Sequence, residues 1–181
     1  GGYNSADLLV HFSLQIIDTE PDYLIIYHGY NDIQSYLTPN FKSDYSHYRR
    51  NLGEIYWKFS IASKFPNIPI KFFNYIINKW FPNFRIQNHL TRAISQGYKI
   101  DPKIDYSQGL RTYERNLKNI ISISLSNDIQ VILSTFCIYL HKKIKDDPLH
   151  ILYKKIVLEE NKIIKKLAKN NNLKIVDCYS L

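Results

Sequence analysis

Three short apolar segments, separated by long stretches with helical periodicity, limit what this chain can fold into. The apolar segments are YLIIY at 23–27, IQVILST at 129–135 and LKIVD at 173–177. The stretches with apolar residues at helical spacing are 5–18, 107–126 and about 148–169. Helices that alternate with short strands favour an α/β domain with a parallel sheet. Right-handed crossovers would place helices on both faces, and the continuous run at 23–27 predicts a strand buried on both faces.

The ends of the predicted helices have their own signals. Asn4 or Ser5 can cap the first helix, and Asp7 suits the positive end of its dipole. Asp147 and Pro148 form a favourable N-cap and first-turn pair for the third helix. These signals support the helix boundaries that the apolar spacing predicts.

Length and composition are those of one globular domain. The chain has 181 residues, of which 45% are hydrophobic, and this is enough for a substantial core. No run approaches the roughly 18 uninterrupted apolar residues of a membrane span, so we expect no transmembrane segment in this chain. Cys137 and Cys178 have no metal-type or redox-type spacing, and we expect buried free thiols.

The chain contains no methionine and starts with Gly1 and Gly2. We therefore expect that the natural N-terminus is missing, which leaves the compartment open. The net charge of +8 could suit nucleic acid or an anionic membrane. However, frequent Lys, Asn, Ile and Tyr are also what an AT-rich genome produces, and no basic cluster accompanies a recognisable binding motif. Nucleic-acid binding is therefore disfavoured.

Residues 34–104 are aromatic and basic, with several prolines. We expect short helices and loops that form an irregular cap or insertion over the sheet. The alternative is a lid or a peripheral membrane patch over 57–84, whose exposed aromatic residues beside lysines would be Trp57, Phe72, Phe73, Trp80 and Phe81.

The first apolar segment runs directly into Gly29-Tyr30-Asn31-Asp32. In parallel α/β sheets, ligands bind beyond the carboxyl ends of the strands. A glycine there allows close backbone approach, and an asparagine amide can donate to an oxygen that becomes negative during a reaction. Asp32 could hold the turn by accepting backbone N–H bonds. The alternative is an ordinary turn that closes a strand.

A second turn, Gly2-Tyr3-Asn4-Ser5, precedes the first helix. Together the two turns resemble those of the SGNH, or GDSL-type, esterase and lipase family. Asp44-Tyr45-Ser46-His47 follows the second turn as a similar segment does in some lysophospholipase-like members. Glu160-Asn161 in the third predicted helix and the final IVDCYSL also resemble the family. The resemblance covers most of the chain outside 51–104. It implies a three-layer α/β/α fold with a parallel flavodoxin-like sheet and no metal or organic cofactor.

The resemblance also implies roles for particular residues. The backbone N–H of Gly2 and the side-chain amide of Asn31 would form the oxyanion hole, with Asp32, Tyr30 and His47 as candidate binding residues. The substrate would be a small-molecule or lipid acyl ester. His28 is expected to be a packed histidine that is hydrogen-bonded near the site.

The chain lacks the family's nucleophile motif, Gly-Asp-Ser, and the catalytic Asp-x-x-His pair at the far end. Asp44-Tyr45-Ser46-His47 matches Asp-x-x-His literally, but it follows the turn that contains Asn31 and is not at the far end of the chain. For His47 we therefore favour loop ordering, ligand binding or a plain surface position over catalysis. The resemblance implies an incomplete domain, inactive by itself, that supplies the family's strands 3, 4 and 5 with an open edge. The alternative function is a non-catalytic α/β binding module, associated with membranes or carbohydrate.

Overall fold

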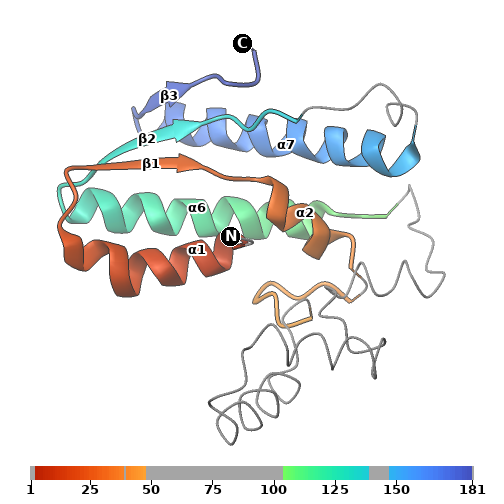
Figure 1. Cartoon of the computed structure of the whole chain (residues 1–181), viewed down its shortest axis with the longest axis horizontal. Coiled ribbons are helices and arrows are strands. Elements are labelled where there is room, and N and C mark those ends of the chain that lie inside the picture. Colours follow the sequence, from red (N-terminus) through yellow and green to blue (C-terminus); the bar gives the residue numbers. More distant parts are fainter. Residues whose placement is uncertain (1–2, 39, 48–103, 139–146, 181) are drawn as a thin grey trace, which may run out of the picture. The chain divides into compact units, whose positions relative to one another are not determined.

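The fold is described from a computed structural model, in which residues 3–38, 40–47, 104–138 and 147–180 are described (Figure 1). The chain divides into two compact units, residues 1–47 with 100–181, and residues 48–99. The second unit overlaps the expected cap at 34–104. It lies outside the described residues, as does the whole of the expected membrane patch at 57–84. All that follows concerns the first unit.

A small parallel sheet forms the centre of this unit. Its strands are β1 (Tyr23–Tyr27), β2 (Gln130–Ser134) and β3 (Lys174–Val176), in the order β1-β2-β3. Tyr23 is opposite Gln130, and Ile132 is opposite both Ile25 and Lys174. The three predicted strands therefore exist and pair in parallel, which confirms the α/β class.

Helices α6 (Ser107–Ser126) and α7 (Pro148–Asn170) make the two crossovers of the sheet. Both crossovers advance in the same direction across β1-β2-β3, so equal handedness places both helices on one face. The two helices contact each other, and α6 also contacts β2 and α1 (Figure 1). The described residues place helices on one face of the sheet, so the predicted three-layer α/β/α arrangement with a flavodoxin-like sheet is compatible with the structure but stays a prediction.

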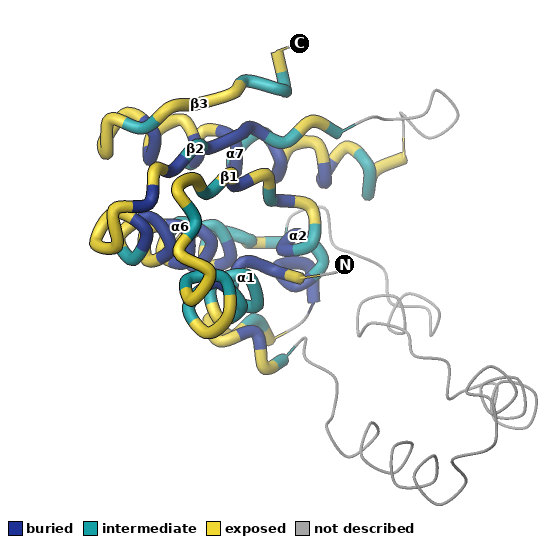
Figure 2. Tube along the Cα trace, turned by 60° about the vertical axis from the view of Figure 1, so that its left-hand side comes forward, coloured by how far each residue is buried: buried dark blue, intermediate teal, exposed yellow. Residues whose placement is uncertain are grey.

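The opposite face of the sheet is open among the described residues. Tyr23, Ile25 and Tyr27 point to this face and are 54%, 66% and 49% exposed. Ile26, which points toward the helices, is buried. All three residues of β3 are also exposed (Figure 2). The prediction that 23–27 is buried on both faces is therefore wrong, because a continuous apolar run cannot reveal whether the second covering layer is present.

The first helical stretch is less regular than its sequence predicts. It is α-helical over α1 (Ser5–His11), then forms a π-helical turn at Phe12–Ile16 and a 3-10 turn at Ile17–Thr19. Asn4 is the N-cap, and its side chain accepts hydrogen bonds from the backbone N–H groups of Ala6 and Asp7. Asp7 in turn accepts from the backbone of Asn4, which completes a capping box. A cap at Asn4, one of the two candidates, is thus confirmed.

The strand-end segment Gly29-Tyr30-Asn31-Asp32 is the start of a helix rather than an isolated turn. Gly29 is the N-cap of α2 (Tyr30–Tyr36), and Asp32 lies in its first turn. Helix α2 contacts both α6 and α7, so it lies where the two crossover helices approach the carboxyl end of β1. This arrangement carries the side chain of Asp32 into the protein interior.

Candidate functional site

The two turns identified in the sequence meet in space. The side-chain Nδ2 of Asn31 donates to the carbonyl oxygen of Tyr3 at 2.9 Å. Nε2 of His28 lies 2.9 Å from the same carbonyl oxygen. The backbone N–H of Ser5 donates to the carboxylate of Asp32. The start of α1 is therefore bound to the carboxyl end of β1 by side chains from residues 28–32. Gly2 itself lies outside the described residues.

Asp32 is the centre of this junction and is fully buried. Its carboxylate accepts from the Ser5 hydroxyl at 2.6 Å and from the Tyr45 hydroxyl, besides the Ser5 backbone. Burial raises the pKa of Asp32, while nearby His28 and the donors from Ser5 and Tyr45 oppose this rise. The expected backbone acceptor role holds, but the donor belongs to α1 and not to the local turn. With no exposed surface, Asp32 cannot contact a ligand in this conformation.

Ser5 is enclosed on every side. Its hydroxyl donates to Asp32, accepts from Nδ2 of Asn116 on α6 at 2.9 Å, and has no exposed surface. A nucleophilic serine needs a base that takes its proton and a path for substrate. Ser5 has a carboxylate partner, no histidine bonded to its hydroxyl among the described residues, and no access. It is therefore a structural serine.

Gly29 lies in close contact with a side chain of α7 and with the segment that follows β2. A Cβ atom there would lie 2.9 Å from Oε2 of Glu160 and 3.5 Å from Cβ of Phe136. Asn161, the next residue of α7, donates to the carbonyl oxygen of Phe136 and accepts from its N–H, both at 2.8 Å. The glycine thus lets α7 and the end of β2 close over the strand end that carries Asn31.

Glu160 is a second buried carboxyl group behind the junction. Its Oε1 accepts from the Tyr36 hydroxyl at 3.0 Å, and its Oε2 has no hydrogen-bond partner among the described residues. Burial, together with the charge of Asp32, raises the pKa of Glu160 well above its usual range. Burial therefore favours the neutral, protonated form of Glu160, which needs no counter-charge in the interior.

Tyr30 is on the outer side of the same strand end and is 41% exposed. Its ring stacks on Phe136 at 6.4 Å and lies 5.6 Å from the ring of Tyr153. Phe136 also stacks on Tyr27 at 4.9 Å. Tyr27, Tyr30 and Phe136 form an aromatic cluster beside Asn31, and Tyr30 keeps part of its surface free for a ligand.

His47 and Asp44 are both engaged in their own loop. Nδ1 of His47 accepts from the backbone N–H of Lys42 at 3.1 Å, so Nε2 donates to the carbonyl oxygen of Ser35 at 2.9 Å. Asp44 accepts from the backbone N–H of Ser46, and this bond lowers the pKa of Asp44. The pair therefore does not form a catalytic Asp-His contact here, and His47 orders the loop that delivers Tyr45 to Asp32.

The two cysteines are only partly as expected. Both are free, but Cys137 is exposed and Cys178 is half-buried. The expectation of buried thiols is wrong because Cys137 follows β2 on the open face, where its Sγ lies 3.6 Å from the Tyr27 hydroxyl. Among the described residues, no group of three His, Cys, Asp or Glu side chains could hold a metal ion.

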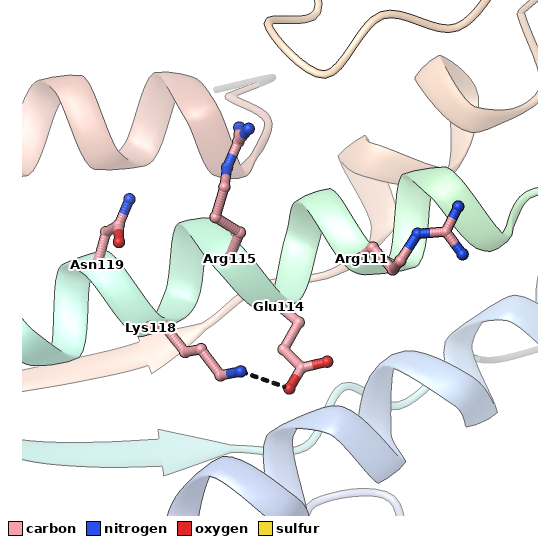
Figure 3. A pocket seen from close by; sticks show the side chains of 5 residues that line it. All are labelled: Arg111, Glu114, Arg115, Lys118 and Asn119. Carbon is pink, nitrogen blue, oxygen red and sulfur yellow. Dashed lines mark ion pairs between the residues drawn. The ribbon is translucent and has the colours of Figure 1, made fainter.

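A separate pocket of about 330 Å³ lies on the outer surface of α6 (Figure 3). Glu114 is paired there with Lys118 at 2.9 Å and with Lys166 at 3.0 Å, which lowers the pKa of Glu114. Arg115 donates to the carbonyl oxygen of Ser43. The sticks in Figure 3 point to different sides of the helix and do not converge on one point. This surface is a set of local ion pairs and helix-to-loop contacts.

Comparisons with known proteins add no assignment: no family model, curated protein or solved structure matches this chain. None of the helices in the described ranges is long and apolar enough to cross a membrane.

Sequence reasoning located the strand end, Asn31 and Asp32, but missed most of the groups around them. Asn116 lies 111 positions from Ser5, and Glu160 lies 124 positions from Tyr36, while Tyr45 reaches Asp32 over 13 positions from a loop that shows no regular pattern. The available signal was a polar residue on a predicted buried helix face, such as Asn116 between Tyr113 and Leu117.

Proposed function

We propose that this chain is the oxyanion-hole part of an SGNH-type ester hydrolase, which cleaves an acyl ester through a serine nucleophile in the complete protein. The observation that carries the proposal is the junction of the two turns. Asn31 Nδ2 lies 2.9 Å from the Tyr3 carbonyl oxygen, directly beside the turn that begins at Gly2. The strand order β1-β2-β3 is compatible with strands 3, 4 and 5 of the family's sheet.

The chemistry depends on the asparagine amide. One N–H of Asn31 donates to Tyr3, and no other bond of this amide is found among the described residues. The second N–H can therefore donate to a substrate oxygen that becomes negative in the tetrahedral intermediate. The bond to Tyr3 fixes the direction of the amide before substrate binds, so little reorganisation is needed in the transition state.

The nucleophile is assigned to polypeptide beyond residues 1–181. No Gly-Asp-Ser occurs within these residues, and Ser5 is enclosed. Asp44 is bonded to Ser46, and His47 is bonded to the carbonyl oxygen of Ser35 in α2. On this proposal the complete protein attacks the ester carbonyl with its serine, expels the alcohol and then hydrolyses the acyl-enzyme with water. Residues 1–181 alone should be inactive.

The test uses the complete gene product. Sequencing on both sides of this reading frame should reveal a Gly-Asp-Ser upstream and an Asp-x-x-His downstream. That protein should hydrolyse p-nitrophenyl acetate and become labelled by a fluorophosphonate, which reacts with activated serines. A gene that encodes neither motif, or a complete protein that is neither labelled nor active, would overturn the proposal.

A non-catalytic binding module is the second candidate, and the exposed aromatic cluster favours it. Tyr27 and Tyr30 leave about half and two fifths of their surfaces open beside Phe136. Aromatic rings with free faces and polar tips are suited to ligand contact. Saccharide binding to an inactive complete protein, lost in Tyr30→Ala and kept in Tyr106→Ala, would favour this candidate over the hydrolase.

A further inference from the structure

His28 lies between a carbonyl oxygen, which only accepts hydrogen bonds, and the carboxyl group of Asp32, which only accepts them when it is ionised. Its Nε2 is 2.9 Å from the Tyr3 carbonyl oxygen, and its Nδ1 is 3.3 Å from Oδ2 of Asp32. The side chain is 12% exposed, so water can compensate little of an unfavourable contact. The Nδ1 contact lacks the alignment of a hydrogen bond in this conformation. A neutral imidazole has one N–H and one lone pair, so it can satisfy only one of these two acceptors.

Asp32 has the contacts of an ionised carboxylate. The Ser5 backbone N–H, the Ser5 hydroxyl and the Tyr45 hydroxyl all donate to it. If Asp32 were protonated, either a hydroxyl of Ser5 or Tyr45 would have to give up its own bond to the carboxyl group and accept instead, or Nδ1 of His28 would have to accept across the 3.3 Å contact, which lacks hydrogen-bond alignment. A buried carboxylate is costly unless a positive group accompanies it, and His28 is the one basic side chain paired with Asp32 among the described residues.

We infer that His28 is held as an imidazolium between Asp32 and the Tyr3 carbonyl, and that in this form it is a positioning residue for Asn31. Both His28 and Asn31 donate to the same carbonyl oxygen, so the ring fixes the acceptor that orients the amide. The role in catalysis rests on the proposed function; the charge state of the ring does not.

The other titratable groups that face this pair do not compete for its proton. Tyr113 on α6 stacks on the His28 ring at 6.3 Å and donates its hydroxyl to the His28 carbonyl oxygen. Burial raises the pKa values of Tyr113 and Tyr45, so both stay neutral. Glu160 also faces Asp32 from α7, and burial keeps it neutral by raising its pKa.

Loss of one of the two ring protons of His28 should weaken the contact between the start of α1 and the end of β1. If the proton on Nε2 remains, the Nδ1 lone pair faces the Asp32 carboxylate. If the proton on Nδ1 remains, the Nε2 lone pair faces the Tyr3 carbonyl. Either state breaks one link between α1 and the strand end, and the Tyr3 carbonyl is then held less firmly against Asn31.

The test is a nuclear magnetic resonance measurement on the ¹⁵N-labelled chain of residues 1–181 at about pH 7.5. An ordinary histidine has a pKa near 6.5, so about a tenth of it is charged at this pH. We expect more than half of His28 to carry protons on both ring nitrogens, and His28→Gln identifies the signals by removing them. A neutral His28 ring in the wild-type chain at about pH 7.5 would overturn the inference without any need for a variant.

Two further measurements address the positioning role. In Asp32→Asn the His28 ring should become mostly neutral at the same pH. The side-chain amide signals of Asn31 should shift with pH together with the His28 ring in the wild type, and should not do so in His28→Gln. Asn31 signals that ignore the His28 titration would refute the positioning role. A charged His28 that moves Asn31 in a complete protein without esterase activity would refute only the proposed function.

Discussion

At the residue scale, the interior of this unit contains two buried carboxyl groups whose surroundings differ. Asp32 is surrounded by donors and pairs with His28, whereas Glu160 has one hydroxyl donor and a raised pKa. Ionised Asp32 contributes to the rise in the Glu160 pKa, so the two sites are linked through their charges. The first two predictions concern Glu160 and the glycine packed against it.

Replacement of Glu160 by Gln should remove a loss of folding stability that grows as the pH rises. In the unfolded chain Glu160 ionises above about pH 4.3. In the folded state it stays protonated because burial raises its pKa. The unfolded state therefore loses its proton first, and wild-type stability should decline as pH rises from about 4.3 toward the folded pKa.

In Glu160→Gln the decline of stability with rising pH should be smaller than in the wild type. At about pH 8 the variant should be more stable than the wild type by on the order of 1 kcal/mol or more. Gln keeps an acceptor for the Tyr36 hydroxyl. Urea denaturation at about pH 5 and pH 8 measures how the free energy of unfolding of each protein changes with pH. Equal pH slopes in the two proteins would show that Glu160 is not buried as a neutral acid.

Replacement of Gly29 by Ala should destabilise the strand end. The new Cβ would lie 2.9 Å from Oε2 of Glu160, which is closer than van der Waals contact permits. Overpacking of this kind costs about 1–3 kcal/mol. Urea denaturation of Gly29→Ala, in the wild type and in the Glu160→Ala variant, measures the interaction free energy between positions 29 and 160. The cost should be smaller without the glutamate side chain, and an equal cost in both backgrounds would contradict the packing described.

At the element scale, the start of α1 depends on its capping box. Asn4 accepts from the N–H groups of Ala6 and Asp7, and the same helix end presents Ser5 to Asp32. Asn4→Ala should cost about 0.5–2 kcal/mol of stability, whereas Asn4→Ser should retain most of the cap. Thermal unfolding followed by circular dichroism compares the two variants. A loss in Asn4→Ser as large as in Asn4→Ala would mean that the amide acts through something other than the cap.

The elements themselves were largely predictable from sequence. The helix at 107–126 was found because apolar periodicity spans 20 residues, and the three strands because each is a short apolar run between helices. What sequence could not supply was the covering of β1, since an apolar run looks the same with one packed face as with two. It also could not find the Ser5, Asp32 and Asn116 contacts, because these join residues 27 and 111 positions apart.

At the scale of the whole molecule, the open edge and open face of β1 make this strand prone to associate with other chains. Only β2 pairs with β1 among the described residues, and Ile25 and the tyrosines beside it face outward. An apolar edge strand without charge or proline promotes edge-to-edge association. The chain of residues 1–181 should therefore self-associate as its concentration rises, which sedimentation velocity measures.

Ile25→Lys should reduce this association, because a charge on an edge strand opposes pairing. Leu14→Lys is the matched control, since Leu14 is 68% exposed, similar to 66% for Ile25, but lies in the first helical stretch. A wild-type chain that stays monomeric at high concentration, or an equal effect of the two lysines, would argue against association through β1.

The central claim is that the Asn31 amide stabilises an oxyanion at the end of β1. The most direct measurement is kcat for a short acyl ester by the complete gene product, in the wild type, in Asn31→Ala and in the control Asn119→Ala, where the asparagine is exposed on α6 (Figure 3). Loss of one oxyanion donor lowers kcat by about 10²–10³. The account predicts a loss of this size for Asn31→Ala, with a folded protein by circular dichroism and unchanged turnover in Asn119→Ala. Unchanged turnover in Asn31→Ala would contradict it.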